Sequence, residues 1–156
     1  MNKTEFYQQL LAQTEVLIAD EKDLIANMAN ISAVLFESLE QVNWAGFYRM
    51  IDQELVLGPF QGKVACIRIP VGKGVCGTAV SEATTQRIAD VHQFSGHIAC
   101  DAESNSEIVI PVMYQSNVIA VLDIDSVAFS RFDEDDQQGL EALVGCLEQN
   151  IERYGI

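Results

Sequence analysis

The chain has 156 residues, of which 49% are apolar, and its mean hydropathy is +0.12. These values exclude a disordered chain and fit one folded domain over residues 1–156 with a sizeable core. Nine basic residues stand against 23 acidic ones, which gives a net charge of −14. Binding to nucleic acid or to an anionic membrane surface requires clustered Lys and Arg, so neither is expected.

Neither a membrane span nor a secretory signal is expected. No apolar run approaches the roughly 18 residues of a membrane-spanning helix. The first residues, MNKTEFYQQLLAQ, lack an apolar signal core, so the chain is expected to be cytoplasmic. Its four cysteines are then thiols kept reduced by the cytosol, and packing, metal binding and redox chemistry remain open to them.

Two amphipathic helices are predicted at the start of the chain. The first runs from about Thr4 to Ile18, with apolar residues at helical spacing. The second is expected to begin after Asp20 as its N-cap and to run to about Leu39. Neither helix carries a functional signal, so their apolar side chains are assigned to the core.

An aromatic, β-rich segment follows the helices. Residues 42–51 predict a strand, Glu54–Phe60 its antiparallel return, and Cys66–Pro70 a short extended piece. Side chains alternate along a strand. The first strand is therefore expected to have Trp44, Gly46, Tyr48 and Met50 on one face and Ala45, Phe47, Arg49 and Ile51 on the other.

The middle of the chain is less regular. The stretch GKGVCG at 72–77 is expected to open a short helix that ends at about Ala83, and Gln86–Asp90 predicts a short strand. Residues 91–106 form a long loop. Loops of this length in a compact domain are usually functional or disordered, and the apolar residues within this one argue against disorder.

The last third of the chain predicts a hairpin and a helix. Residues 107–113 and 118–125 form the hairpin, and a helix capped by Asp133 runs to about Tyr154. The resulting fold class is α+β: a central, mostly antiparallel sheet with N-terminal and C-terminal helices packed on it.

One face of the last predicted strand is acidic. Alternation is expected to place Val118, Ala120, Leu122 and Ile124 on one face and Ile119, Val121, Asp123 and Asp125 on the other. The two aspartates stand about 7 Å apart, and Glu107 on the neighbouring strand could add a third carboxylate. They either reach solvent at the strand end or form a site for an ammonium group or a cation, since buried carboxylates need such a partner.

Two aromatic residues and the cysteines also carry alternative interpretations. Trp44 and Tyr48 either pack in the core or wall a pocket for a cationic or thioether-like ligand. Cys146, between leucines of the last helix, is assigned to packing. Cys76 lies at a predicted helix N-terminus beside Lys73, which favours a thiolate, so simple electrostatics ranks Cys76 as the easiest thiol to ionise.

The thiol in the long loop is not singled out by charge. Cys100 has His97 nearby but Asp101 next to it, and the protein is anionic. Cys66, Cys76, His97 and Cys100 make a conceivable zinc set, but their irregular, long spacings lack the short Cys-x-x-Cys knuckle of a zinc site. The spacing therefore disfavours a metal.

Taken together, these segments closely resemble the free methionine-(R)-sulfoxide reductases, a single-domain branch of the GAF family. The resemblance covers nearly the whole chain. It rests on VNWAGFY at 42–48, GPFQGKVACIRIP at 58–70, GKGVCGTA at 72–79, HIACDAESNSEIVIPV at 97–112 and AVLDIDS at 120–126. Generic GAF domains share the architecture but lack this set of three cysteines.

The resemblance implies a role for each candidate residue. Cys100 is the nucleophile that attacks the sulfoxide sulfur, Cys66 is the resolving thiol, and Cys76 is an auxiliary thiol for disulfide exchange. The substrate-binding residues that it implies are Trp44, Tyr48, Glu107, Asp123 and Asp125. It also implies a homodimer that is recycled by thioredoxin, acts in oxidative stress and uses no metal and no cofactor.

The implied reaction reduces free L-methionine-(R)-sulfoxide to L-methionine. It proceeds through a sulfenic acid on Cys100 and an intramolecular, redox-active disulfide. Acidic side chains would hold the substrate's ammonium group, which a methionine inside a peptide lacks. The alternative is a non-catalytic GAF-type sensor that binds a small molecule without turnover.

Overall fold

The structure is a computed structural model that describes residues 1–98, 100 and 102–156. Its helices are α1 (Lys3–Ile18), α2 (Leu24–Ser38), α3 (Gly74–Glu82), the short 3₁₀ turn η1 (Val91–Gln93) and α4 (Glu134–Tyr154). Its strands are β1 (Val42–Ile51), β2 (Glu54–Gly62), β3 (Arg68–Pro70), β4 (Gln86–Ile88), β5 (Ser106–Tyr114) and β6 (Asn117–Ser126).

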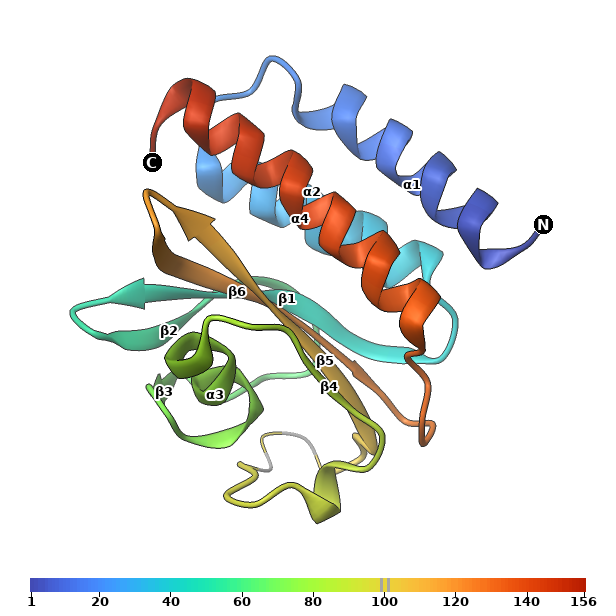
Figure 1. The fold of residues 1–156 in the computed structure, drawn as a ribbon, viewed down its shortest axis with the longest axis vertical. Helices are drawn as coiled ribbons and strands as arrows, with labels where there is room; N and C mark the ends of the chain where they lie inside the picture. Colours follow the sequence, from blue (N-terminus) through green and yellow to red (C-terminus); the bar gives the residue numbers. More distant parts are fainter. Residues whose placement is uncertain (99, 101) are drawn as a thin grey trace.

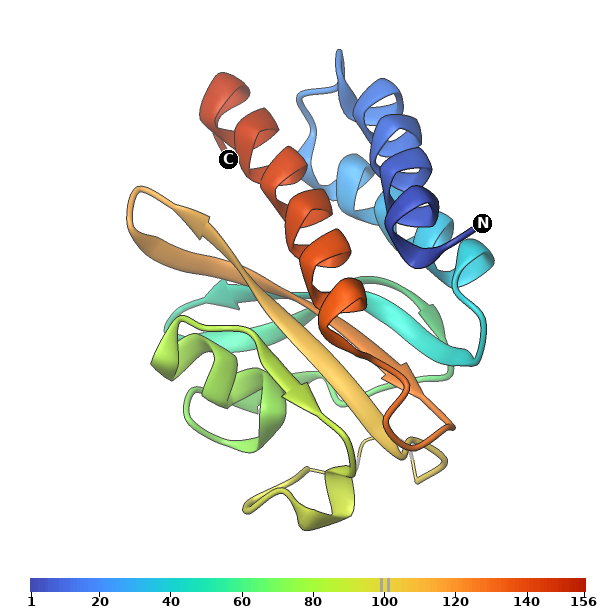
Figure 2. The same cartoon turned by 45° about the vertical axis from the view of Figure 1, so that its right-hand side comes forward.

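The six strands form one sheet in the order β3-β2-β1-β6-β5-β4, and every pair of neighbours is antiparallel. α2 and α4 cover one face of the sheet, with α1 packed outside them, while α3 lies on the opposite face (Figures 1 and 2). The predicted α+β class with an antiparallel sheet and terminal helices is confirmed. This architecture forms because the sheet carries apolar side chains on both of its faces, and helices on each side keep them from water.

Two apolar clusters lie on the two faces of the sheet. Ala45 and Phe47 of β1 pack with the helices, whereas Trp44 and Tyr48 pack in the cluster beneath α3. The alternation predicted for β1 is therefore confirmed. Because both faces are covered, the first strand reads as almost continuously apolar and not as a half-solvated strand.

A register irregularity corrects one face assignment at the end of the hairpin. Val112 pairs with Ala120, but Met113 pairs with Val118, so Ile119 is an extra residue on β6. Val118 consequently packs with the cluster beneath α3 and Ile119 with the helical side. The predicted grouping of Val118 with Ala120 is wrong, because one inserted residue reverses the faces beyond it.

The start of α2 also differs from its prediction. Asp20 is not the N-cap; Asp23 is, and its carboxylate accepts a hydrogen bond of 2.9 Å from the backbone N–H of Ala26. The buried amide of Asn150 on α4 donates to the carbonyl of Glu21 at 2.9 Å. This tertiary hydrogen bond holds the connection open and delays the helix by one turn.

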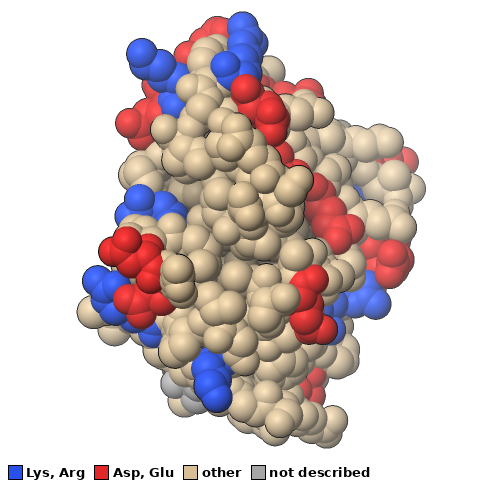
Figure 3. All heavy atoms as spheres, turned by 60° about the vertical axis from the view of Figure 1, so that its left-hand side comes forward, with Lys and Arg blue, Asp and Glu red and all other residues tan. Residues whose placement is uncertain are grey.

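Charges on the surface are dispersed. On the face in Figure 3, Lys and Arg side chains are scattered, many of them beside acidic ones, around a broad uncharged area. None of the helices in the described ranges combines the length and apolar character that a bilayer span requires.

Buried Asp136 joins the two ends of the chain. Its carboxylate accepts hydrogen bonds from Tyr7 Oη at 2.7 Å and from Lys3 Nζ at 2.7 Å, both on α1. It also accepts from the backbone N–H of Asp133 at 2.9 Å, which completes a capping box at the start of α4 as the Asp133 cap predicted. Arg131 lies 3.3 Å from the same carboxylate.

We expect Asp136→Ala to lower the free energy of unfolding by about 2–4 kcal/mol, because it leaves a buried hydroxyl and a nearly buried guanidinium without their acceptor. Urea unfolding of the variant measures this loss. Asp135→Ala is the matched control: Asp135 is exposed in the same helical turn, and its removal costs a few tenths of a kcal/mol through the helix dipole. Equal losses in both variants would contradict the role of Asp136.

Candidate active site

Strand register brings three carboxylates to one face of the sheet. On β6, Asp125 pairs with Trp44 of β1 on one side and with Glu107 of β5 on the other. Asp123, two residues earlier on β6, pairs with Gly46 of β1. The acidic residues thus occupy neighbouring positions on the face beneath α3, next to the aromatic residues of β1.

Two of these carboxylates are buried. Glu107 is 7% exposed and Asp123 is 6% exposed, while Asp125 is half-buried. They do not reach solvent at the strand end, which was one of the two predicted alternatives. Acidic side chains placed opposite each other in a buried sheet destabilise it while both are charged, so this cluster needs a shared proton or a positively charged ligand.

The pKa values show how the cluster accommodates its charge. Burial raises the pKa of Glu107 well above its usual value, and the negative charges of Asp123 and Asp125 raise it further. Burial also raises the pKa of Asp123, but hydrogen bonds from Glu107 and Cys76 oppose that rise. Glu107 is therefore the member of the cluster that favours its protonated form most, and Asp123 accepts a hydrogen bond from it.

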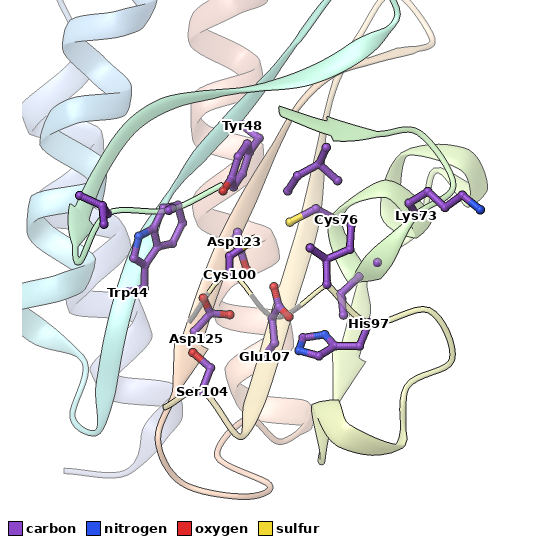
Figure 4. Close-up of a pocket in the computed structure, with 16 residues that line it drawn as sticks. Trp44, Tyr48, Lys73, Cys76, His97, Cys100, Ser104, Glu107, Asp123 and Asp125 are labelled. Carbon is purple, nitrogen blue, oxygen red and sulfur yellow. The ribbon is translucent and has the colours of Figure 1, made fainter. Parts of the chain in front are cut away.

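The glycines at 74 and 77 place Cys76 against the acidic face. Gly74 has a φ of +64°, and a Cβ there would lie 3.2 Å from Ile98. A Cβ on Gly77 would collide with the carbonyl of Pro70. Only glycine permits this close entry into α3, and the result is a Cys76 thiol directed at the carboxylates (Figure 4).

The electrostatic ranking of Cys76 as the easiest thiolate is wrong. Burial raises the pKa of Cys76 well above its usual value, and the charges of Asp123 and Glu107 raise it further. Lys73, expected to stabilise the thiolate, points away from the pocket in Figure 4. Desolvation and two neighbouring carboxyls therefore outweigh the helix terminus.

The other two candidate thiols are joined to each other. Cys66 and Cys100 form a disulfide, with their Cα atoms 5.4 Å apart and a sequence separation of 34. Cys100 also lines the cavity above the acidic face. The pair cannot serve as two zinc ligands in this state, so the structure does not assemble the set Cys66, Cys76, His97 and Cys100.

The fourth thiol lies elsewhere. Cys146 on α4 is half-buried and packs against the helical core, as its packing assignment predicted. Cys146 and Cys76 are the free cysteines of the chain.

Trp44 and Tyr48 hold the segment that carries Cys66. Trp44 Nε1 donates to the carbonyl of Lys63 at 3.1 Å, and Tyr48 Oη donates to the carbonyl of Cys66 at 2.8 Å. The two rings stack with centroids 5.9 Å apart and are nearly fully buried, yet both line the cavity. They are therefore both core residues and pocket walls.

One small cavity collects most of the candidate residues. It measures about 40 Å³. Its lining includes seven of the eight candidate site residues: Trp44, Tyr48, Cys76, Cys100, Glu107, Asp123 and Asp125. Cys66 joins them through its disulfide with Cys100.

The cavity also has lining residues that the sequence did not assign to a binding site. Ser104 is buried and accepts a hydrogen bond from Asn43 Nδ2 at 3.1 Å; nothing in its loop sequence distinguished it from a solvated serine. His97, considered only as a zinc ligand, lines the cavity with a buried Nδ1 that has no hydrogen-bond partner. Burial, aided by His92, lowers the pKa of its imidazole. Asp101 lies outside the described residues.

Comparison with known proteins agrees with this geometry. The GAF domain model matches residues 26–152. Free methionine-R-sulfoxide reductase of Escherichia coli is 59% identical over 149 residues, which cover 96% of this chain and 90% of that protein.

Solved structures are similar in sequence and fold. The free methionine-R-sulfoxide reductase of Neisseria meningitidis, in complex with its substrate, has a TM-score of 0.94 and 44% identity, covering 99% of this chain and 93% of that one. The reduced fRMsr of Staphylococcus aureus has a TM-score of 0.91 and 54% identity, covering 93% of this chain and 94% of that one. With its GAF fold and its three cysteines around an acidic pocket, this chain belongs to the free methionine-R-sulfoxide reductase family of GAF-domain proteins.

Proposed function

We propose that this protein reduces free L-methionine-(R)-sulfoxide to L-methionine with its own thiols. The observation that carries the proposal is the Cys66–Cys100 disulfide, one sulfur of which belongs to a residue lining the acidic cavity. A sensor that only binds a ligand has no need for a redox-active pair at its pocket wall. The relatives named for this activity have the same fold.

The acidic face supplies recognition of a free amino acid. The substrate's ammonium group neutralises the negative charge at Asp123 and Asp125, which burial otherwise makes costly. A methionine sulfoxide inside a peptide has a neutral amide at that position and leaves the charge uncompensated. The stacked rings of Trp44 and Tyr48 receive the methyl end of the side chain, beside the sulfoxide sulfur.

The first chemical step forms a sulfenic acid. The Cys100 thiolate attacks the sulfoxide sulfur, while the proton held by Glu107 passes to the sulfoxide oxygen and makes the sulfur more electrophilic. The oxygen is transferred to Cys100, the S–O bond of the substrate breaks, and methionine leaves. Cys100 is thereby oxidised by two electrons.

The second step forms the disulfide. The Cys66 thiol attacks the sulfenic acid on Cys100 and releases water. In the product of this step the two Cα atoms lie 5.4 Å apart, within the usual range for a disulfide. Trp44 and Tyr48 act as positioning residues here, because their hydrogen bonds fix residues 63–66. Cys76 is an auxiliary thiol for disulfide exchange.

The disulfide form is the product state of this cycle. In this form Cys100 is bonded to Cys66 and has no free thiol with which to attack a substrate. We infer that substrate is bound productively only after the disulfide is reduced.

An external dithiol closes the cycle, and we infer that it is thioredoxin. Cys66 is flanked in sequence by Val64, which is 89% exposed, and Ile67, which is 66% exposed. Exposed branched apolar side chains beside a disulfide favour docking of a protein reductant. Such recycling belongs in the reducing cytosol, where disulfides formed during oxidative stress are reduced back to thiols.

We also infer a homodimer, as the resemblance implies. Apolar side chains lie exposed where α1 ends and α2 begins: Val16, Leu17 and Ile25 are 82%, 41% and 42% exposed. Burying them against a second copy would gain about 25 cal/mol for each Å² of apolar surface removed from water.

The central test follows racemic free methionine sulfoxide over time with protein and a dithiol, with the two epimers and methionine resolved. The wild type is expected to consume only the R epimer. Cys100→Ser is expected to release no methionine, because the nucleophile is absent, and Cys66→Ser a single equivalent, because the sulfenic acid is not resolved. Consumption of neither epimer would refute the function.

Cys146→Ser is the matched control for these variants. It removes a half-buried thiol outside the cavity, so full turnover is expected. A stoichiometric burst of methionine from Cys100→Ser would contradict the assignment of the nucleophile.

A second prediction concerns the proton on Glu107. Because its pKa is raised in the folded state, the stability that depends on this proton is fully present below the usual value of 4.5 and is lost as pH rises through the higher folded pKa. Glu107→Gln is expected to be more stable than the wild type on the alkaline side, and to lose about 10²–10⁴-fold in kcat as the proton donor disappears.

Urea unfolding at several pH values, alongside steady-state kinetics, checks both parts. Glu82→Gln, at an exposed glutamate of α3, is the control and should follow the wild-type profile. The proton-donor role is refuted if Glu107→Gln shows the same decline with pH and the same kcat as the wild type.

A third prediction concerns reductant docking. Ile67→Asp is expected to raise the KM for thioredoxin about 10-fold, since it places a charge at a surface that must be desolvated. Turnover with dithiothreitol should stay unchanged, because a small dithiol needs no docking surface. Val127→Asp, at another exposed valine, is the control. An equal effect of Ile67→Asp with both reductants would contradict a docking role.

A further inference from the structure

A set of potential metal ligands lies at the deep side of the cavity. Cys76 Sγ, one carboxylate oxygen of Glu107 and one of Asp123 all lie within 4.8 Å of one another. All three residues are buried. They come from three different elements, α3, β5 and β6, so the packing of α3 on the sheet, and no local sequence motif, creates the set.

A second observation points to a ligand at this position. Asp123 is 6% exposed, and its Oδ1 is buried without any hydrogen-bond partner. Nδ1 of His97 is likewise buried and unpartnered and belongs to the lining of the same cavity. A buried acceptor oxygen without a partner is unusual in a folded protein, and a cation bound among Cys76, Glu107 and Asp123 would satisfy it.

The donor types define the class of cation. A thiolate favours Zn²⁺ and chemically similar thiophilic ions, whereas Mg²⁺ and Ca²⁺ require shells of six or more oxygen ligands. A cavity of about 40 Å³ holds an ion with a water molecule. Lys73, the basic side chain in the lining, points away from the carboxylates (Figure 4), so it does not occupy the cation position.

We propose that the disulfide form of this protein binds one thiophilic divalent cation, Zn²⁺ in the first instance, through Cys76, Glu107 and Asp123, with a water molecule as the fourth ligand. The ion replaces the proton on the Cys76 thiol and the proton shared by the carboxyls, and both are released to the buffer. No oxidation state changes. Because Cys66 and Cys100 are bonded to each other, the site exists independently of the reactive pair.

This site extends beyond the proposed reductase chemistry and does not depend on it. The cation occupies the place assigned to the substrate's ammonium group, so a loaded protein cannot bind an amino acid. In the disulfide form, the cation would also hold α3 against β5 and β6, because its ligands come from all three elements.

The test uses metal-free disulfide protein and Cd²⁺, whose thiolate complexes absorb in the ultraviolet. Titration is expected to give about one Cd²⁺ per chain with a thiolate charge-transfer band, and Zn²⁺ should displace it. Cys76→Ala should abolish the band. Asp123→Asn should weaken binding by more than the roughly 10–100-fold typical of residues that only support a metal ligand.

Cys146→Ser is the matched control, since Cys146 is the other free thiol and lies on the opposite face of the sheet. It should bind Cd²⁺ as the wild type does, and circular dichroism establishes that each variant is folded. A band that survives in Cys76→Ala, that disappears in Cys146→Ser, or that never forms in the wild type overturns the proposal. These measurements detect metal binding and do not depend on catalytic turnover. A protein that fails to reduce methionine sulfoxide would therefore still give an interpretable result.

Discussion

Negative charge confined within a covered sheet is the constraint on which the site depends. Glu107 and Asp125 pair across β5 and β6, with Asp123 beside them, where water cannot screen their repulsion. The molecule accommodates this cluster by a raised pKa of Glu107, which favours its protonated form, and by hydrogen bonds among the carboxyls and Cys76. A pocket in this state favours a positively charged ligand and can deliver a proton to it.

The two faces of the sheet have different roles: one packs the main apolar core, and the other carries the candidate active site. The helical side holds an almost wholly apolar cluster, and its polar groups, such as Asp136 and Asn150, are satisfied by hydrogen bonds. The opposite face carries the acidic cluster, unpartnered polar atoms and the disulfide. A firmly packed helical layer thus supports strands whose other face is electrostatically unfavourable, an arrangement typical of sites that bind and transform a ligand.

The chemistry of each thiol depends more on its surroundings in the folded protein than on the residues next to it in sequence. Cys76 sits at the start of a helix, but α3 presses it onto the acidic face, and its pKa rises. Cys100, which charge did not single out, is bonded to Cys66 and lines the cavity. Two thiols of one chain therefore differ in their chemistry because one is desolvated among carboxyls and the other meets a partner sulfur.

Local patterns in the sequence determined the secondary structure, the α+β class and the two faces of β1, because alternation and helical spacing depend on neighbouring residues alone. They also placed Asp123 and Asp125 on one face of β6. Only the tertiary structure decided that Asp123 is buried, that Ile119 is an inserted residue reversing the faces at the start of β6, and that Ser104 enters the cavity. Those outcomes depend on strand register and on desolvation by α3, which arise from contacts between segments distant in sequence.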